Sequence, residues 1–256
     1  MRAPNLRDYR PAYTIHEMET PVKSYLGFRA FLLFAAIVFT ALGIWQVQRL
    51  FWKLDLIARV DARVHAAAAA PPTANEWPII KSTDAEYRHV VLKGTFDNLR
   101  ETLVQAVTER GPGFWVLTPL ATADGGMVLI NRGFVPPDRR DPTSRAEGQL
   151  QGEVTVTGLL RLSEPGGAFL RSNNPAAGSW YSRDVQAIGE NKQLVKLVPY
   201  FVDADATANP GGYPVGGLTV IQFRNSHLVY ALTWFALAIM SFAAMIMIPR
   251  FLRKET

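Results

Sequence analysis

Two long apolar segments stand near the two ends of the chain. The sixteen residues of Ala30–Trp45 include only two that are not strongly apolar, and the 21 residues of Leu228–Ile248 carry no charged side chain. A bilayer core is crossed by about 20 apolar helical residues. The pattern therefore predicts two transmembrane helices, over residues 26–47 and 226–248.

The first helix is predicted to continue beyond the membrane as an amphipathic stalk over residues 48–66. Apolar residues recur there at a spacing of three or four, which places them on one helical face. The segment Ala66–Pro72 (AAAAAPP) ends the helix, because proline cannot continue it. Residues 67–86 are accordingly interpreted as a linker. The apolar stripe of the stalk comprises Leu50, Leu54, Ile57, Val60 and Val64.

From Tyr87 onward the apolar pattern changes to period two. Val90, Leu92 and Phe96 alternate with polar neighbours, and clusters of Gly, Pro and Asp separate short runs of the same kind. Many short strands with such turns are typical of a small barrel or sandwich. A short helix is expected over 184–192, capped by Asp184. The other expected strands lie at 101–107, 114–120, 127–131, 154–162, 199–203 and 218–223.

The predicted fold is an α+β membrane protein, with a helical hairpin flanking a small antiparallel β-barrel or sandwich over residues 87–223. Residues 1–29 carry five Lys/Arg against three acids, and residues 249–256 three against one, so +4 of the net charge of +5 lies at the two ends. Positive charge favours the cytoplasmic side. The tails, 1–25 and 249–256, are therefore placed in the cytoplasm, with the β-domain exported. A cleaved signal peptide is disfavoured, because no small-x-small site follows the first segment.

Composition excludes several classes of function. The chain has no cysteine, which removes disulfide scaffolds, zinc ribbons and thiol chemistry. It has no glycine-rich nucleotide loop. Its basic charge lies mainly in the tails and indicates membrane topology rather than nucleic-acid binding. A Ser/His/Asp hydrolase would need His65 or His89 as its base, and no G-x-S-x-G turn accompanies them.

His227 is the candidate for a ligand-binding residue, since it is a histidine at the outer end of the second apolar segment. On a helix it shares one face with Tyr230 and Trp234, whereas Leu228, Leu232, Phe235, Ile239 and Phe242 form a bulky face suited to lipid. The first helix offers Trp45, Gln46 and Arg49 at the same boundary, and Arg224 precedes His227. One interpretation is that these residues are interfacial anchors. The other is a haem site, with His227 as ligand to the iron, aromatic rings on the macrocycle and arginines on the propionates.

Several segments, in order, resemble the Surfeit locus protein 1 family of cytochrome c oxidase assembly factors. The similarity spans roughly residues 42–238, and no single segment would be specific alone. The segments are LGIWQVQR at 42–49, YRHV at 87–90, GTFD at 94–97, GFWVLTPL at 113–120, VLINRGFVP at 128–136, NNP at 173–175, WY at 180–181, RD at 183–184, GG at 216–217 and RNSHLVYALTW at 224–234.

The resemblance implies an assembly factor that is not an enzyme, sits in the inner membrane and assists maturation of oxidase subunit I. It implies haem a as a transient cofactor, with the family histidine at His227, and haem A synthase as a further partner. Asp8, Glu17 and Glu19 make the N-terminal tail unlike a transit peptide, which favours a bacterial member.

Two alternatives to a haem-handling factor stay open. One is a membrane scaffold that stabilises subunit I without binding haem. The other is an enzyme acting on haem or copper, although the absence of cysteine and of a Met-rich exported segment argues against copper. Within the β-domain, Arg132 is interpreted either as a partner contact or as part of a buried salt bridge, beside turn glycines and prolines that have a structural role.

The tail charges predict a topology that reporter fusions can test. A reporter active only in the cytoplasm should give signal when fused after Thr256, because both tails are expected there. The same reporter at Gly125 should be silent. Signal at Gly125 would overturn the predicted topology.

Overall fold

The computed structural model describes residues 22–77, 85–168 and 170–252, so most of the two predicted tails lies outside the described residues. The chain divides into two compact units. A helical unit holds the chain up to Lys53 and from Arg224 onward, and a β-domain holds Leu54–Phe223. Two helices of the described chain are long and apolar enough to cross a bilayer, Leu26–Val64 and His227–Met247.

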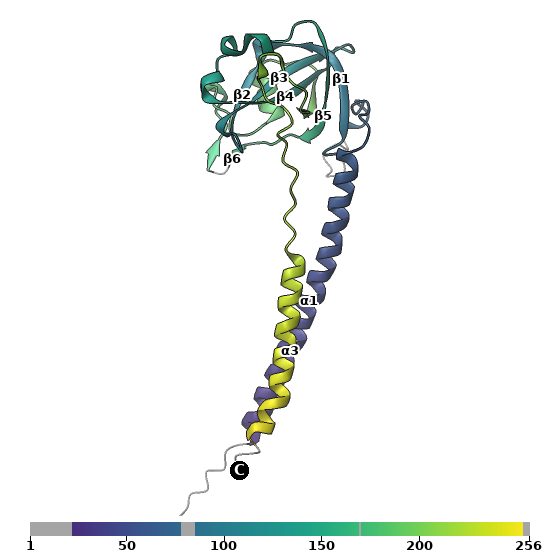
Figure 1. Cartoon of the computed structure of the whole chain (residues 1–256), viewed down its shortest axis with the longest axis vertical. Helices are drawn as coiled ribbons and strands as arrows, with labels where there is room; N and C mark the ends of the chain where they lie inside the picture. Colours follow the sequence, from purple (N-terminus) through teal and green to yellow (C-terminus); the bar gives the residue numbers. More distant parts are fainter. Residues whose placement is uncertain (1–21, 78–84, 169, 253–256) are drawn as a thin grey trace, which may run out of the picture. The chain divides into compact units, whose positions relative to one another are not determined.

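The helical unit consists of α3 (His227–Leu252) running alongside most of the apolar part of α1 (Val22–Val64) (Figure 1). Small residues let the two backbones approach, since Ala36, Ala231 and Ala238 are all buried. Phe235 packs its ring directly over Gly43. The prediction that Phe235 belongs to a lipid-facing surface is therefore wrong, because the missing side chain of Gly43 leaves room for a ring between the helices.

As predicted, the helix α1 continues beyond residue 47 without a break. It ends at Val64, and its last turns carry the exposed ion pair between Arg59 and Asp55. Of the predicted apolar stripe, Val60 is buried whereas Leu54 is half exposed. Beyond the helix, Ala69 pairs with Val90 of the first strand, so the beginning of the predicted linker already belongs to the β-domain.

In the residues that the structure describes, the β-domain contains six main strands. A short hairpin and the α-helix α2 (Val185–Asn191) lie between the fifth and the last of them. Asp184 caps α2 by accepting a hydrogen bond from the Ala187 amide, as predicted. The strands are β1 (His89–Phe96), β2 (Thr102–Thr108), β3 (Gly111–Thr122), β4 (Met127–Val135), β5 (Glu153–Leu162) and β8 (Leu197–Ala204), and the hairpin is β6 (Gly167–Ala168) with β7 (Arg171–Ser172).

The sheet closes on itself into a barrel. Its order is β1-β5-β8-β4-β3-β2, and a further pairing of β1 with β3 completes the ring. Gly94 makes the closure possible, because it pairs with β5 and β3 at once and a side chain there would collide with the carbonyl of Ala121. The predicted antiparallel arrangement is wrong at one place, since β4 and β8 run parallel.

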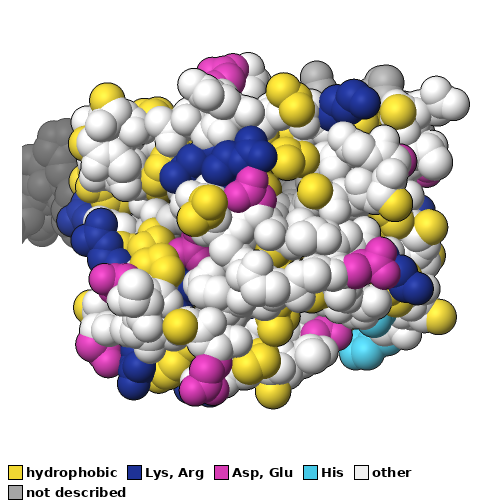
Figure 2. Space-filling model, turned by 90° about the horizontal axis from the view of Figure 1, so that it is seen from above, with side chains coloured by type: hydrophobic (Ala, Val, Ile, Leu, Met, Phe, Trp, Pro, Cys, Tyr) yellow, Lys and Arg dark blue, Asp and Glu magenta, His cyan; other side chains and the backbone are white. Residues whose placement is uncertain are grey.

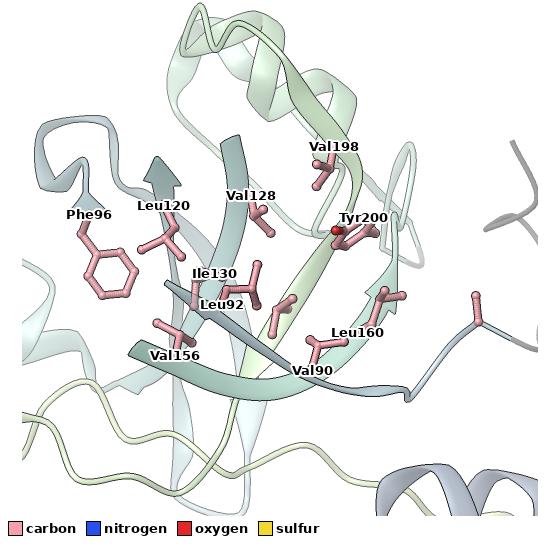
Figure 3. Close-up of a cluster of buried hydrophobic side chains, with 12 residues drawn as sticks. Val90, Leu92, Phe96, Leu120, Val128, Ile130, Val156, Leu160, Val198 and Tyr200 are labelled. Atoms are coloured by element: carbon pink, nitrogen blue, oxygen red, sulfur yellow. The ribbon is translucent and has the colours of Figure 1, made fainter. Parts of the chain in front are cut away.

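Two apolar clusters lie on opposite faces of the curved sheet. The first fills the barrel interior and includes Val90, Leu92, Ile130 and Leu160 (Figure 3). The second lies outside, where Trp180 and α2 cover the sheet. Successive strand residues point to opposite faces, and the two clusters alternate in the same way along β8: Tyr200 and Val202 lie inside and Phe201 outside.

Most of the predicted strands are present. The segment 218–223 is the exception, as it leads to α3 without regular secondary structure. It contains apolar residues at alternate positions, but no neighbouring strand edge is paired with it. Alternation alone therefore predicted a strand that does not form.

Replacing Val156 by Asp should destabilise the β-domain by about 3 kcal/mol or more, because the carboxylate would be buried without a partner. Val156 lies in the interior cluster with 9% of its surface exposed. The matched control is Val107→Asp, since Val107 is 87% exposed on β2. Thermal unfolding of both purified variants measures the difference. Equal melting temperatures would show that Val156 does not face the core.

Candidate functional site

The two membrane-helix candidates His227 and Gln46 are in direct contact. Nδ1 of His227 lies 2.7 Å from Oε1 of Gln46, across the boundary between α3 and α1. Gln46 is buried, with 9% of its surface exposed. The sequence placed both residues at the same depth, and the structure brings them together.

This contact assigns the tautomer of the neutral imidazole. The amide oxygen of Gln46 accepts a hydrogen bond, so Nδ1 of His227 carries the proton and donates it. The other ring nitrogen, Nε2, then keeps its lone pair. At the backbone, the side chain of Asn225 accepts a hydrogen bond from the His227 amide, at 3.4 Å, which holds the start of α3. His227 is thus fixed through both its ring and its backbone.

Trp234 is part of an aromatic pair between the two helices. Its ring stacks on Phe39, with centroids 5.6 Å apart and planes 27° from parallel. Tyr230 lies one turn closer to His227 but is 55% exposed. Sequence reasoning missed Phe39, because an aromatic residue within a long apolar segment carries no distinguishing signal.

The remaining candidates lie at the same end of the helices. Arg49 is exposed and its guanidinium lies 4.4 Å from the ring centre of Trp52. Trp45 is half exposed, and Arg224 is exposed. Within the described chain, the structure gives none of these three a hydrogen bond, ion pair or ring contact with His227. They offer groups to a ligand but do not form a closed site with the histidine.

The helix pair has two different sides. At roughly 100° per residue, Tyr230 and Trp234 lie on one side of the buried line formed by Ala231 and Ala238; we call this the aromatic side. Phe235, Ile239 and Phe242 lie on the other, which we call the groove side. An apolar groove of about 740 Å³ runs there between the helices. Its other lining residues are Leu33, Ala36, Ile37, Thr40, Ala41, Ile44 and Ala238.

The residues at this end of the helices fit the haem group that the sequence resemblance implies. Axial ligation needs an imidazole nitrogen with a lone pair, which is Nε2 of His227 in the assigned tautomer. Exposed aromatic rings can stack on a macrocycle, and Tyr230 on the aromatic side provides one. Propionates pair with guanidinium groups, and Arg49 and Arg224 are both exposed within three residues of Gln46 and His227.

A second polar cluster, which sequence reasoning missed, lies in the β-domain around Asp203. This carboxylate is 3% exposed and receives hydrogen bonds from Asn131 at 2.7 Å, Arg161 at 2.9 Å and Arg183 at 3.1 Å. Thr219 donates a further bond at 3.0 Å. Both oxygens are therefore occupied by protein donors.

The Asp203 cluster joins segments that are distant in the sequence. Arg161 also pairs with Glu86, at 3.1 Å, and Arg183 also pairs with Glu164. Thr219 belongs to the segment that leads towards α3. Because its hydrogen-bonding capacity is used internally, we assign the cluster a structural role. A charged residue inside an apolar strand, as in YFVDA at 200–204, was the signal available in the sequence.

Arg132 is buried and forms no ion pair in the described chain. It is 2% exposed, donates to the carbonyl of Gly148 and to Asn209, and lies 4.6 Å over the ring of Phe96. Its partners are thus neutral oxygens and a ring, and burial lowers the pKa of Arg132 to about 10. The interpretation of this segment as structural agrees with that environment.

The face of the β-domain in Figure 2 has no patch of a single kind. Basic, acidic and apolar side chains are interspersed over it. Such a mixture is typical of a solvated surface. On this face, therefore, the surface itself does not identify a binding site.

Comparison with known proteins identifies related sequences over most of the chain. The sequence model of the SURF1 family matches residues 33–239. The chain is 37% identical over 223 residues to Surfeit locus protein 1 of Rattus norvegicus, covering 81% of this chain and 71% of that protein. It is 36% identical over 224 residues to the Homo sapiens protein of the same name, covering 81% and 72%. It is also 36% identical over 232 residues to a SURF1-like protein of Monosiga brevicollis, covering 86% of each.

Replacing Asp203 by Asn should destabilise the β-domain by about 1.5–3 kcal/mol, the range for a hydrogen bond to a charged group. Arg161 and Arg183, whose side chains are 14% exposed, would lose their shared carboxylate. The control Asp138→Asn removes an exposed carboxylate, 75% accessible and 3.7 Å from Arg139, and should change stability by less than about 0.5 kcal/mol. Thermal unfolding measures both. If the two variants melt alike, the cluster does not hold the domain together.

Proposed function

We propose that this chain, which belongs to the SURF1 family, assists the assembly of cytochrome c oxidase by holding haem a at His227 for the oxidase's subunit I. Membership of the family and the sequence motif around His227 support cytochrome c oxidase as the enzyme that receives the haem a. The observation that carries the haem proposal is the hydrogen bond from Nδ1 of His227 to Gln46, which leaves Nε2 with its lone pair.

A membrane position is supported by the register of the two helices. The apolar part of α3 covers 21 residues, His227–Met247. Counting the same length back from Gln46, the partner of His227, reaches Leu26, and the segment 26–46 contains one charged residue, Arg29. Two matched spans of this length are about 30 Å long, the thickness of a bilayer core. We propose a bacterial inner membrane, cytoplasmic tails and a periplasmic β-domain, consistent with the charges of the tails.

In this proposal each candidate has a defined task. Nε2 of His227 would hold the iron of haem a, a group that would supply redox chemistry to the oxidase. Tyr230, Trp234 and Trp45 provide rings for the macrocycle, and Arg224 and Arg49 pair with the propionates. No residue is assigned a catalytic task. Haem A synthase is the proposed donor.

A scaffold that stabilises subunit I without haem is the second candidate. The groove between α1 and α3 favours it, because its lining includes Ala36, Ala41 and Ala238. Small residues let a further membrane helix approach closely. This candidate assigns the His227 end only the task of an interfacial anchor.

Replacing His227 by Ala should lower haem a occupancy and change the Soret band, because the axial nitrogen is lost. Membrane insertion should persist, since α3 keeps its apolar length. Spectroscopy of protein purified in the presence of haem a measures the effect.

His65→Ala is the matched control, because the side chain of His65 is 73% exposed at the end of α1. That variant should retain the wild-type spectrum. An unchanged spectrum in His227→Ala would instead favour the scaffold.

A further inference from the structure

The amide of Gln46 has a more specific task than contact with a ligand. We infer that Gln46 is a positioning residue, which fixes the tautomer of His227 and tunes its strength as a ligand. The inference rests on the proposed binding of haem a at His227. It concerns how the site works once that binding is granted.

The geometry gives Gln46 the position that an outer partner takes in metal sites. A histidine that binds a metal through one ring nitrogen usually donates its other N–H to a carboxylate, a carbonyl or water. The 2.7 Å contact from Nδ1 of His227 to Oε1 of Gln46 is this arrangement, with a side-chain amide as the carbonyl. Because Gln46 is 9% exposed, water competes little for that oxygen.

The partner belongs to a different helix from the histidine, and this makes the ring orientation depend on helix packing. Gln46 is on α1 and His227 begins α3. Three residues from Gln46, Gly43 receives the ring of Phe235, which fixes the separation of the helices near the contact. The imidazole is therefore oriented before any ligand arrives.

A neutral partner suits a factor that must release its ligand. A carboxylate at this position would make the imidazole more basic and the iron bond stronger. It would also leave a charge in an apolar environment whenever the ligand is absent. An amide orients the ring without either effect. We therefore attribute weak, reversible ligation to the choice of glutamine.

Two variants separate positioning from simple packing. Gln46→Leu keeps an apolar side chain of similar size but has no acceptor, and Gln46→Glu keeps the acceptor and adds charge. Gln48→Leu is the matched control, since Gln48 is an exposed glutamine on the same helix.

The first measurement needs no haem. Nitrogen-15 NMR of labelled histidine in the full chain, in lipid nanodiscs, should show Nδ1 of His227 protonated and Nε2 unprotonated. Gln46→Leu should give a mixture of tautomers, whereas Gln48→Leu should match the wild type. A wild-type His227 that already populates both tautomers would overturn the inference.

The second measurement uses haem a. Affinity should fall about tenfold to a hundredfold in Gln46→Leu, the range found when outer partners are removed. The reduction potential should rise in the order Glu, Gln, Leu at position 46, and the iron–histidine stretching frequency should fall in that order. A purely structural role would not produce this order.

The outcomes distinguish a failure of the inference about Gln46 from a failure of the proposed function. Suppose that the wild type binds haem a through His227, but that affinity, reduction potential and stretching frequency in both Gln46 variants equal the wild-type values. The inference is then wrong and the proposed function stands. If the wild type binds no haem a, or binds it equally well in His227→Ala, the proposed function fails and the inference falls with it.

Discussion

A single hydrogen bond, from His227 to Gln46, sets both the alignment of the two apolar helices and the orientation of the imidazole. In an apolar environment a polar side chain without a partner costs free energy, so each residue stabilises the position of the other. Sliding one helix by a turn would separate them. The apolar spans would then no longer end at the same depth. The register that aligns the two apolar spans is thus the register in which Gln46 meets His227.

In the β-domain, too, polar groups removed from water stabilise one another, here as charged pairs. Asp203 sits between Arg161 and Arg183, and the three groups would each be costly to bury alone. Together they connect β5 and β8 with the residues that precede α2 and, through Thr219, with the chain that leads to α3. The cluster uses donors from four separate segments, which makes it specific for one arrangement of the barrel. This explains why a strand otherwise filled with apolar residues carries a carboxylate.

The sequence predicted those features that depend on local pattern. Period two located most strands, and Asp184 was recognisable as a helix cap. It did not predict the parallel pairing of β4 with β8, because alternation carries no information about strand direction. It assigned Phe235 to lipid, since the space above Gly43 exists only once the helices meet. It placed His227 and Gln46 at the same end of the two helices, where they meet. Which ring nitrogen of His227 carries the proton could be inferred only from the contact in the structure.

The two sides of the helix pair bear on whether haem handling and subunit binding exclude each other. Tyr230 and Trp234 lie on the aromatic side, whereas the groove lies on the other side of the line through Ala231 and Ala238. A ligand held by His227 with the aromatic side would leave the groove free for a helix of the oxidase. Both candidate functions can therefore operate in one molecule without competing for surface. A helix bound in the groove would contact Phe235 and Ala36, which set the spacing of α1 and α3.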